Sequence, residues 1–266
     1  TYINNLFDKN NYDFDAEKGN ISCEKDASKP FGLLSHQKIV RDYLNIYSPY
    51  RGLLLYHGLG AGKTCGSIGI AEGLKSEYEI IVLTPASLKT NYIKELKKCG
   101  DPLYKTNNFW VFKELTKEIE ILAYHRILGV SKKFIKTHGG VYMVDNEQTE
   151  SNYDTMSDEK KFILNEQIDQ MIKHKYKFYS YNGGLRTDVL EGLEDIAMRK
   201  TGQKNPFSHK VVIIDEVHNF ISRIVNKIDR PNSLSYRLYE HLMSAVNCRL
   251  VFLSGTPIIN YPNEIG

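Results

Sequence analysis

The sequence predicts an α/β fold in which a mostly parallel, doubly wound sheet carries helices on both faces. Three observations predict it. The 266 residues are 41% apolar and 25% charged, which is typical of a globular chain with room for one large domain or two small ones. Short apolar runs are continuous rather than alternating, as in strands that helices cover on both faces. Stretches of helical periodicity separate the outer runs, which is the βαβ order of a parallel sheet.

The predicted elements follow this order along the chain. Residues 1–32 are polar and form an irregular lead-in, and residues 33–266 form one domain. Helical periodicity predicts helices over residues 33–46, 64–74, 88–98 and 234–246. The apolar runs predict strands over residues 53–56, 80–83, 109–112, 211–214 and 250–253.

The alternation stops between about residues 115 and 176, and we expect an insertion on the sheet there. Residues 134–144 are typical of a hairpin around Gly139-Gly140, and apolar spacing predicts a helix over 158–172. The tract 145–159 holds six acids and no Lys or Arg. Because these carboxylates would repel phosphates, the tract is either a solvated loop, which we favour, or a docking surface for a protein.

Composition excludes several classes of protein. No apolar stretch approaches the length of a membrane span, and the N-terminus lacks the layout of a signal peptide, so we expect neither a membrane protein nor a secretory leader. The four cysteines are too widely spaced for a zinc knuckle. The formal net charge is only +3, so any affinity for nucleic acid must come from local features. The chain begins without Met, and we expect it to be a fragment of a longer protein.

The segment after the first predicted strand is rich in glycine and reads His57-Gly58-Leu59-Gly60-Ala61-Gly62-Lys63-Thr64. Glycines between a strand and a helix let main-chain N–H groups approach phosphate oxygens, and the helix N-terminus attracts negative charge. In this pattern the lysine reaches the β- and γ-phosphates and the following hydroxyl binds Mg²⁺, which assigns Lys63 and Thr64. The pattern begins with glycine in its usual form, where this chain has His57. Cys65 beside the loop is expected to be a small packed residue.

The fourth predicted strand leads into Asp215-Glu216-Val217-His218. A carboxylate at the tip of a buried strand beside a phosphate loop can hold Mg²⁺, the role predicted for Asp215. Glu216 would orient and deprotonate the attacking water. His218 would relay between the nucleotide and the neighbouring strand, the fifth predicted one. That strand ends in Ser254-Gly255-Thr256, whose hydroxyls can hydrogen-bond the acidic motif and couple it to movement.

In this order the motifs resemble those of the superfamily 2 helicases and translocases, especially the Swi/Snf-like branch. Leu34-Ser35-His36-Gln37 resembles the glutamine motif that reads adenine, and it precedes motif I at residues 60–64. Leu83-Thr84-Pro85-Ala86-Ser87-Leu88 resembles motif Ia, and residues 179–183 resemble motif Ib. Residues 215–218 and 254–256 resemble motifs II and III.

Two longer stretches, residues 215–222 and 254–260, resemble the nucleoside triphosphatase I and early transcription factor ATPases of large cytoplasmic DNA viruses. The resemblance implies a RecA-like P-loop NTPase lobe that binds ATP and Mg²⁺, with a second RecA-like lobe beyond residue 266. That second lobe would supply an arginine to the γ-phosphate, so the first lobe alone should hydrolyse ATP very slowly. The residues implied in ATP binding are Gln37, Gly58, Leu59, Gly60, Ala61, Gly62, Lys63, Thr64 and Cys65.

Motifs Ia and Ib contact the nucleic acid backbone in the family, which implies a set of contacts here. The residues are Thr84, Pro85, Ser87, Lys89, Asn182 and Gly183. Thr84-Pro85 and Asn182-Gly183 are also good turn sequences, so a purely structural role competes with this assignment.

The predicted function is that of an ATP-hydrolysing helicase or translocase, viral and cytoplasmic, acting in transcription on DNA rather than RNA. A viral RNA polymerase or an accessory transcription subunit is the expected protein partner. Two alternatives remain open at this point: a nucleotide-gated protein-interaction module that does not translocate, and the motor subunit of a restriction enzyme.

Overall fold

The computed structural model of the chain describes residues 2–9, 33–56, 58, 60–181, 185–227, 230 and 232–256. They form two compact units. The first comprises Thr1–Tyr92 and Phe178–Gly266, and the second comprises Ile93–Lys177. The second unit therefore begins before the insertion expected at about residue 115, because most of helix α5 (Lys89–Cys99) and the 3-10 turn η1 (Pro102–Tyr104) belong to it.

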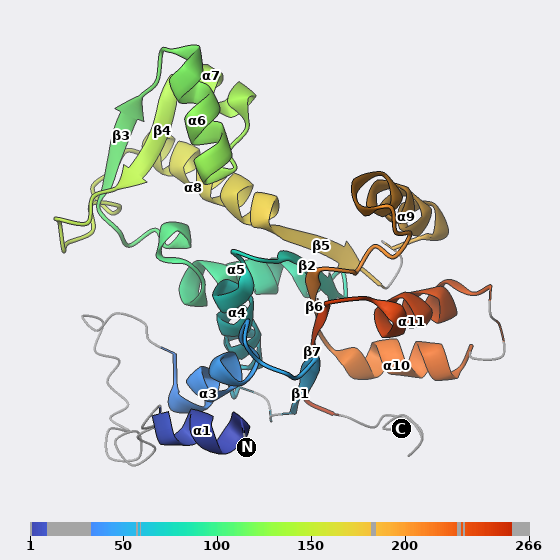
Figure 1. The fold of residues 1–266 in the computed structure, drawn as a ribbon. Helices are drawn as coiled ribbons and strands as arrows, with labels where there is room; N and C mark the ends of the chain where they lie inside the picture. The colour runs from blue at the N-terminus through green and yellow to red at the C-terminus, as the bar shows by residue number, and fades with distance from the viewer. Residues whose placement is uncertain are drawn as a thin grey trace. The chain divides into compact units, whose positions relative to one another are not determined.

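A five-stranded sheet organises the first unit, in the order β1-β7-β6-β2-β5 (Figure 1). Its strands are β1 (Gly52–Tyr56), β2 (Glu79–Thr84), β5 (Tyr176–Ser180), β6 (Lys210–Ile214) and β7 (Arg249–Ser254). The pairs β1–β7, β7–β6 and β6–β2 are parallel. The register sets Tyr56 beside Ser254 and Leu83 beside Ile214, so the segments that follow these strands emerge at one edge of the sheet.

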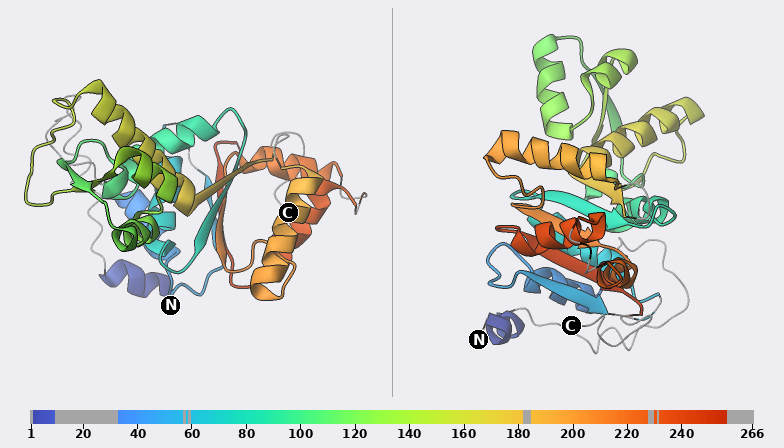
Figure 2. Two further views of the ribbon diagram at one scale, coloured as in Figure 1. Left: turned by 90° about the horizontal axis from the view of Figure 1, so that it is seen from above. Right: turned by 90° about the vertical axis from the view of Figure 1, so that its right-hand side faces the viewer.

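Helices cover both faces of this sheet, as Figure 1 and the left view of Figure 2 show. On one face, Leu83, Ile214 and Leu250 form a buried cluster with side chains of the three helices α9 (Thr187–Thr201), α10 (Val217–Val225) and α11 (Leu234–Ser244). The alternate residues, such as Ile213 and Val251, are equally buried on the face that α4 (Lys63–Leu74) covers. Burial on both faces explains the continuous apolar runs of the sequence. The predicted α/β fold with a mostly parallel sheet is confirmed.

Three glycines of α4 let another helix approach closely. A Cβ at Gly66 would lie 3.6 Å from Val40, and one at Gly69 would lie 3.0 Å from Leu33. A Cβ at Gly73 would lie 3.7 Å from Arg41. Val40 and Arg41 belong to α3 (Ser35–Tyr43), so these glycines serve mainly helix–helix packing. Glycine inside a helix costs about 1 kcal/mol relative to alanine, and this packing offsets the cost.

One predicted strand lies outside the parallel sheet. The run at 109–112 becomes β3 (Trp110–Glu114), which pairs antiparallel with β4 (Gly140–Val144) in the second unit. Trp110 is buried there, whereas the next four residues are exposed. The apolar residues of this run therefore do not form a strand that is covered on both faces. The fifth strand of the main sheet is β5, which the sequence did not predict.

The hairpin expected at 134–144 is wrong in its first half. Residues Lys132–His138 form helix α7, and only β4 follows as a strand. The Ser131 hydroxyl accepts a hydrogen bond from the Phe134 N–H, and Gly139 ends the helix with φ +74°. Both are ordinary helix-capping signals, and they outweigh the β-branched character of this short segment.

The remaining helices are of two kinds. Helices α3, α4, α5, α8 (Asp158–Lys175) and α11 lie where the sequence predicted them. The sequence did not predict α1 (Tyr2–Lys9), α6 (Glu118–Leu128), α9 and α10. Among the described helices, none combines the length and the apolar character needed to cross a membrane.

Candidate functional site

The glycine-rich loop between β1 and α4 has the backbone that the sequence requires. Gly60 and Gly62 have φ values of +79° and +72°, in the left-handed region that favours glycine. Lys63 is the first residue of α4, and its Nζ donates to the Gly58 carbonyl oxygen at 3.2 Å. His57 and Leu59 lie outside the described residues. The loop thus places a lysine at the positive end of a helix.

Gln37 holds this loop by a side-chain hydrogen bond to its main chain. Its Nε2 donates to the Gly62 carbonyl oxygen at 3.1 Å, and its Oε1 accepts from the Leu34 N–H at 3.0 Å. The side chain is only 3% exposed, and a Cβ at Gly62 would collide with it. His36, which the sequence did not single out, lies with its Nε2 3.1 Å from the Ala61 carbonyl oxygen. In this arrangement the Gln37 amide holds the loop, and its contact with adenine stays a prediction.

The first turn of α4 is tied to α5 by a buried pair of hydroxyls. The Ser67 hydroxyl donates to the Thr64 carbonyl oxygen at 2.8 Å, so the Tyr92 hydroxyl donates to Ser67 Oγ, also at 2.8 Å. Ser67 and Tyr92 are almost fully buried. Cys65 is buried as well. Thr64 therefore sits on a rigid turn.

The acidic pair follows β6 at the same edge of the sheet. The Asp215 N–H donates to the Leu83 carbonyl oxygen at 2.9 Å, and Asp215 Oδ2 accepts from the Thr84 hydroxyl at 3.3 Å. Burial, and next to it the neighbouring Glu216 carboxylate, raise the pKa of the Asp215 carboxyl to about 6. The Thr84 hydrogen bond and the Lys63 ammonium act in the opposite direction. Lys63 and Glu216 thus each lie close enough to Asp215 to act on it electrostatically.

Glu216 has an unusual backbone conformation. Its φ of +49° is left-handed, which costs a non-glycine residue about 1–2 kcal/mol. The Glu216 N–H donates to Asp215 Oδ1 at 3.1 Å, and Glu216 is the N-cap of α10. Strained residues of this kind concentrate at functional sites, where the surrounding structure holds them.

The donor set fits a hard divalent cation. The Thr64 hydroxyl and the Asp215 carboxylate are oxygen ligands of the type that Mg²⁺ prefers. Burial and the Glu216 carboxylate both raise the pKa of Asp215, and the Lys63 ammonium offsets them only in part. A bound cation would supply further positive charge.

His218 connects the acidic motif to the end of β7. Its Nδ1 lies 2.9 Å from Ser254 Oγ and 3.4 Å from a Glu216 carboxylate oxygen. Because the Ser254 hydroxyl donates to the Thr256 carbonyl oxygen at 2.8 Å, Nδ1 must carry the proton of the histidine–serine hydrogen bond. Thr256 Oγ1 lies 3.4 Å from the same nitrogen, and Gly255 lies between these two hydroxyl residues. The contact between motifs that the sequence suggested is therefore present.

Tyr181, at the end of β5, completes the site, and sequence reasoning gave it no role. Its hydroxyl donates to the carbonyl oxygens of Asp215 at 2.9 Å and Glu216 at 3.0 Å. Its own carbonyl oxygen accepts from Arg223 Nη1 at 2.7 Å. Nothing in the spacing of these residues signals the contact, since it depends on β5 joining the sheet beside β2.

Comparison with known proteins identifies viral relatives, although no family model matches the sequence. A "Putative ATP-dependent RNA helicase" of Acanthamoeba polyphaga mimivirus is 33% identical over 276 residues, which cover 100% of this chain and 38% of that protein. A "Termination factor NPH-I homolog" of African swine fever virus is 26% identical over 219 residues, which cover 81% of this chain and 21% of that protein. The "SWI2/SNF2 ATPase core in complex with dsDNA" of Sulfolobus solfataricus matches 92% of this chain and 36% of its own, with 14% identity and a TM-score of 0.44.

This chain is related to the viral superfamily 2 helicases. Identity of 33% along the whole chain decides the relationship, and the resemblance of the motifs is thereby confirmed. The chain spans 38% or less of the length of these curated viral relatives.

The residues that the helicase resemblance assigned to nucleic acid fall into three groups. The Thr84 side chain is only 1% exposed and donates to Asp215, and Pro85 is buried, so neither offers its side chain to a phosphate. The Thr84 hydroxyl faces the acidic site, and the assignment of Thr84 to nucleic acid stays a prediction. Ser87 and Lys89 are exposed, and Lys89 Nζ lies 5.8 Å from the centroid of the Phe178 ring. Asn182 and Gly183 lie outside the described residues.

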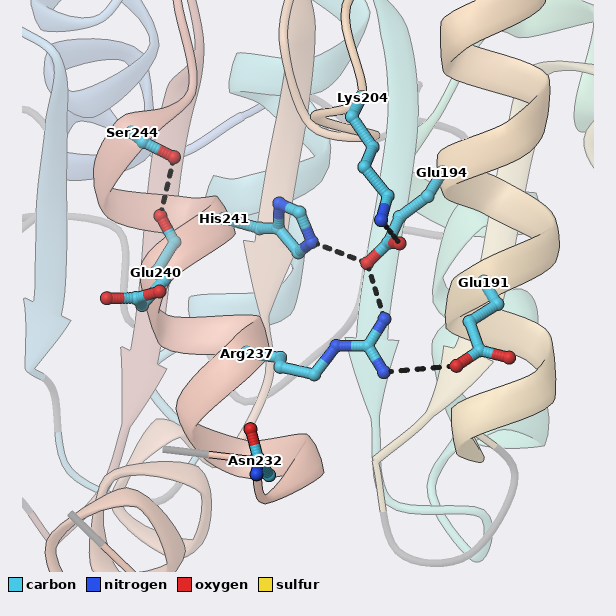
Figure 3. A pocket seen from close by; sticks show the side chains of 8 residues that line it. All are labelled: Glu191, Glu194, Lys204, Asn232, Arg237, Glu240, His241 and Ser244. Carbon is cyan, nitrogen blue, oxygen red and sulfur yellow. Dashed lines mark hydrogen bonds and ion pairs between the residues drawn. The ribbon is translucent and has the colours of Figure 1, made fainter. Parts of the chain in front are cut away.

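The helicase-type lobe also has a polar pocket between α9 and α11 (Figure 3). Glu194, 2% exposed, accepts from Arg237 Nη2 at 2.8 Å and pairs with His241 Nε2 at 2.7 Å and Lys204 Nζ at 3.1 Å. Burial acts to raise the pKa of Glu194, but the hydrogen bonds from these three partners hold it at about 2. Every charged group drawn at Glu194 is therefore satisfied within the protein, which indicates a structural cluster.

Proposed function

We propose that the chain is the ATP-binding lobe of an ATP-dependent nucleic acid helicase or translocase. The observation that carries the proposal is the meeting of Lys63, Asp215 and Glu216 at one edge of the sheet, beside the glycine-rich loop. This combination of a lysine, a metal-binding carboxylate and a base is the set that ATP hydrolysis requires.

Each residue has a distinct role in this proposal. Lys63 leaves its contact with the Gly58 carbonyl and binds the β- and γ-phosphates. Thr64 and Asp215 would hold Mg²⁺, which neutralises phosphate charge when it is bound. Glu216 accepts a proton from the attacking water. His218, hydrogen-bonded to Ser254, connects this site to β7, so that changes at the phosphates can move Ser254, Gly255 and Thr256.

The proposal extends to substrate, partners and place of action. We propose movement on DNA within viral transcription, in the cytoplasm or virion, because one relative is named a termination factor homolog. Another relative is named an RNA helicase, so the nucleic acid must be tested directly. A second RecA-like lobe and a viral RNA polymerase or accessory subunit are the proposed partners, with Ser87 and Lys89 as exposed candidates for the nucleic acid backbone.

The decisive experiment measures steady-state ATP hydrolysis by the full-length protein with and without duplex DNA, single-stranded DNA or RNA. We expect DNA to stimulate hydrolysis. Lys63→Ala should abolish ATP binding, and Glu216→Gln should leave binding intact while lowering turnover by at least about 10²-fold.

Asp188→Asn is a suitable control, because Asp188 is an exposed acid that pairs with the exposed Arg186. ATP binding without stimulation by any nucleic acid would contradict the motor and favour the nucleotide-gated interaction module. A nuclease activity in the same full-length protein would instead favour the restriction motor.

A further inference from the structure

We propose that Tyr181 is a positioning residue for Glu216, acting through the main chain of the β6–α10 turn. The inference rests on the proposed function, in which Glu216 is the base. It rests equally on a geometry that can be tested without catalysis.

The first step of the argument is the contact itself. A single hydroxyl hydrogen of Tyr181 is shared between the carbonyl oxygens of Asp215, at 2.9 Å, and Glu216, at 3.0 Å. These two carbonyl groups lie on either side of the N–Cα bond of Glu216, and rotation about that bond is the left-handed φ. The hydroxyl therefore holds the backbone at the point where its conformation is least favourable.

The second step is that Tyr181 cannot easily move. It is 4% exposed, and its ring packs edge-on against Phe220 at a centroid distance of 5.7 Å. Its carbonyl oxygen accepts from Arg223 at 2.7 Å. Phe220 and Arg223 both belong to α10, the helix that Glu216 caps. Tyr181 is thus attached to one turn and its helix through the hydroxyl, the ring and the main chain.

The third step concerns the base. The Glu216 carboxylate is partly exposed and lies 3.4 Å from His218 Nδ1, so few side-chain contacts fix its direction. Its position depends mainly on its backbone. A displacement of about 1 Å at a reacting group can cost 10²-fold in rate, so loss of the Tyr181 hydroxyl should be felt in catalysis.

The test is Tyr181→Phe in the full-length protein, with Tyr179→Phe as the matched control. Tyr179 is a half-buried tyrosine in β5, two residues before Tyr181, and it packs against the core cluster to which Tyr181 belongs. We expect Tyr181→Phe to lower kcat about 10- to 100-fold with KM for ATP within about twofold of the wild type. The control should keep both constants. In Tyr181→Phe combined with Glu216→Gln, turnover should equal that of Glu216→Gln alone, because the tyrosine acts through the glutamate.

A second measurement is independent of activity. Amide hydrogen exchange in the peptide covering residues 215–219 should be faster in Tyr181→Phe and unchanged in Tyr179→Phe. Unchanged exchange, an unchanged kcat in an active protein, or a double variant that falls below Glu216→Gln by the full single-variant factor would each overturn the inference. A wild-type protein without ATPase activity would contradict the proposed function, while the exchange result would still decide the role of Tyr181.

Discussion

At the scale of single residues, the site holds the Asp215 carboxylate in a buried position that disfavours its negative charge. Asp215 is a buried acid beside a second carboxylate, and its pKa of about 6 lies above the ordinary value of 3.8. The folded chain therefore holds the proton more tightly than the unfolded chain. The unfolding free energy consequently falls as pH rises from about 4 to about 6, by up to about 3 kcal/mol, and stays lower at neutral pH.

Asp215→Asn should remove this penalty. Asparagine keeps one oxygen, which can accept from the Glu216 N–H in place of Oδ1, while its amide nitrogen takes the place of Oδ2. The Thr84 hydroxyl can then donate to its other acceptor, the Pro85 carbonyl oxygen, so the main change is the loss of the charge. In thermal denaturation at pH 7 without Mg²⁺, we expect a higher Tm than the wild type, and with Mg²⁺ and ATP a smaller stabilisation by the ligands. Asp188→Asn, at an exposed acid, should change the Tm little. A lower Tm for Asp215→Asn would show that the buried charge is not destabilising.

The sequence predicts single residues well only where a motif names them. Lys63, Thr64, Asp215 and Glu216 stand in patterns whose chemistry is local, and the fold brings the charged ones together. Gln37 and Thr84 stand in motifs too, but burial directs both side chains inward, to the loop and to Asp215. The role of Tyr181 could not be predicted, because Asp215 and Glu216 lie 34 and 35 positions further along the chain, and the contact depends on which strands pair.

At the scale of secondary-structure elements, α9 and α11 are joined through Glu194. This carboxylate is buried and has two cationic partners, Arg237 and Lys204, besides its hydrogen bond with His241. Glu191 on the same helix is 58% exposed and meets Arg237 at 3.3 Å (Figure 3). We expect Glu194→Ala to destabilise the packing of α9 by about 2–3 kcal/mol, because the charges of Arg237 and Lys204 lose their buried partner. Glu191→Ala should cost about 1 kcal/mol or less.

Hydrogen exchange of the α9 amides measures this difference, with Glu191→Ala as the control. Because the pKa of Glu194 is held at about 2, below its ordinary 4.5, the stabilisation is complete above about pH 4.5 and is lost as pH falls through about 2. Equal protection of α9 in the two variants would show that the cluster does not hold the helix.

Whole elements were predictable where periodicity and length agreed. The helix over 158–172 and the strand over 211–214 match α8 and β6 closely. The run at 109–112 was misassigned because four apolar letters cannot distinguish a strand covered on both faces from one in an open two-stranded sheet. Helix α10 was missed because it starts inside the acidic motif, at Val217, without a loop that would mark its beginning.

At the scale of the whole molecule, the arginines of this chain bear on whether the lobe can hydrolyse ATP by itself. Arg51 donates to the carbonyls of Leu242 and Ala245, and Arg249 donates to those of Ser48 and Tyr50. Arg223 binds Tyr181, and Arg186 pairs with Asp188. These four guanidinium groups hold main-chain or surface positions, so none is a candidate for the γ-phosphate in the described arrangement.

We therefore expect residues 1–266 alone to bind ATP with Mg²⁺ but to hydrolyse it 10³- to 10⁵-fold more slowly than the full-length protein, the range that an arginine finger contributes. Binding can be measured by calorimetry, with Lys63→Ala as the control that removes it, and turnover by phosphate release. The two measurements belong together, because binding without turnover shows that the loop and the acidic pair are intact and that the missing component stabilises the transition state. Turnover by residues 1–266 at the rate of the full-length protein would mean that a group within this chain supplies the charge, and the proposal of a second lobe as its source would fail.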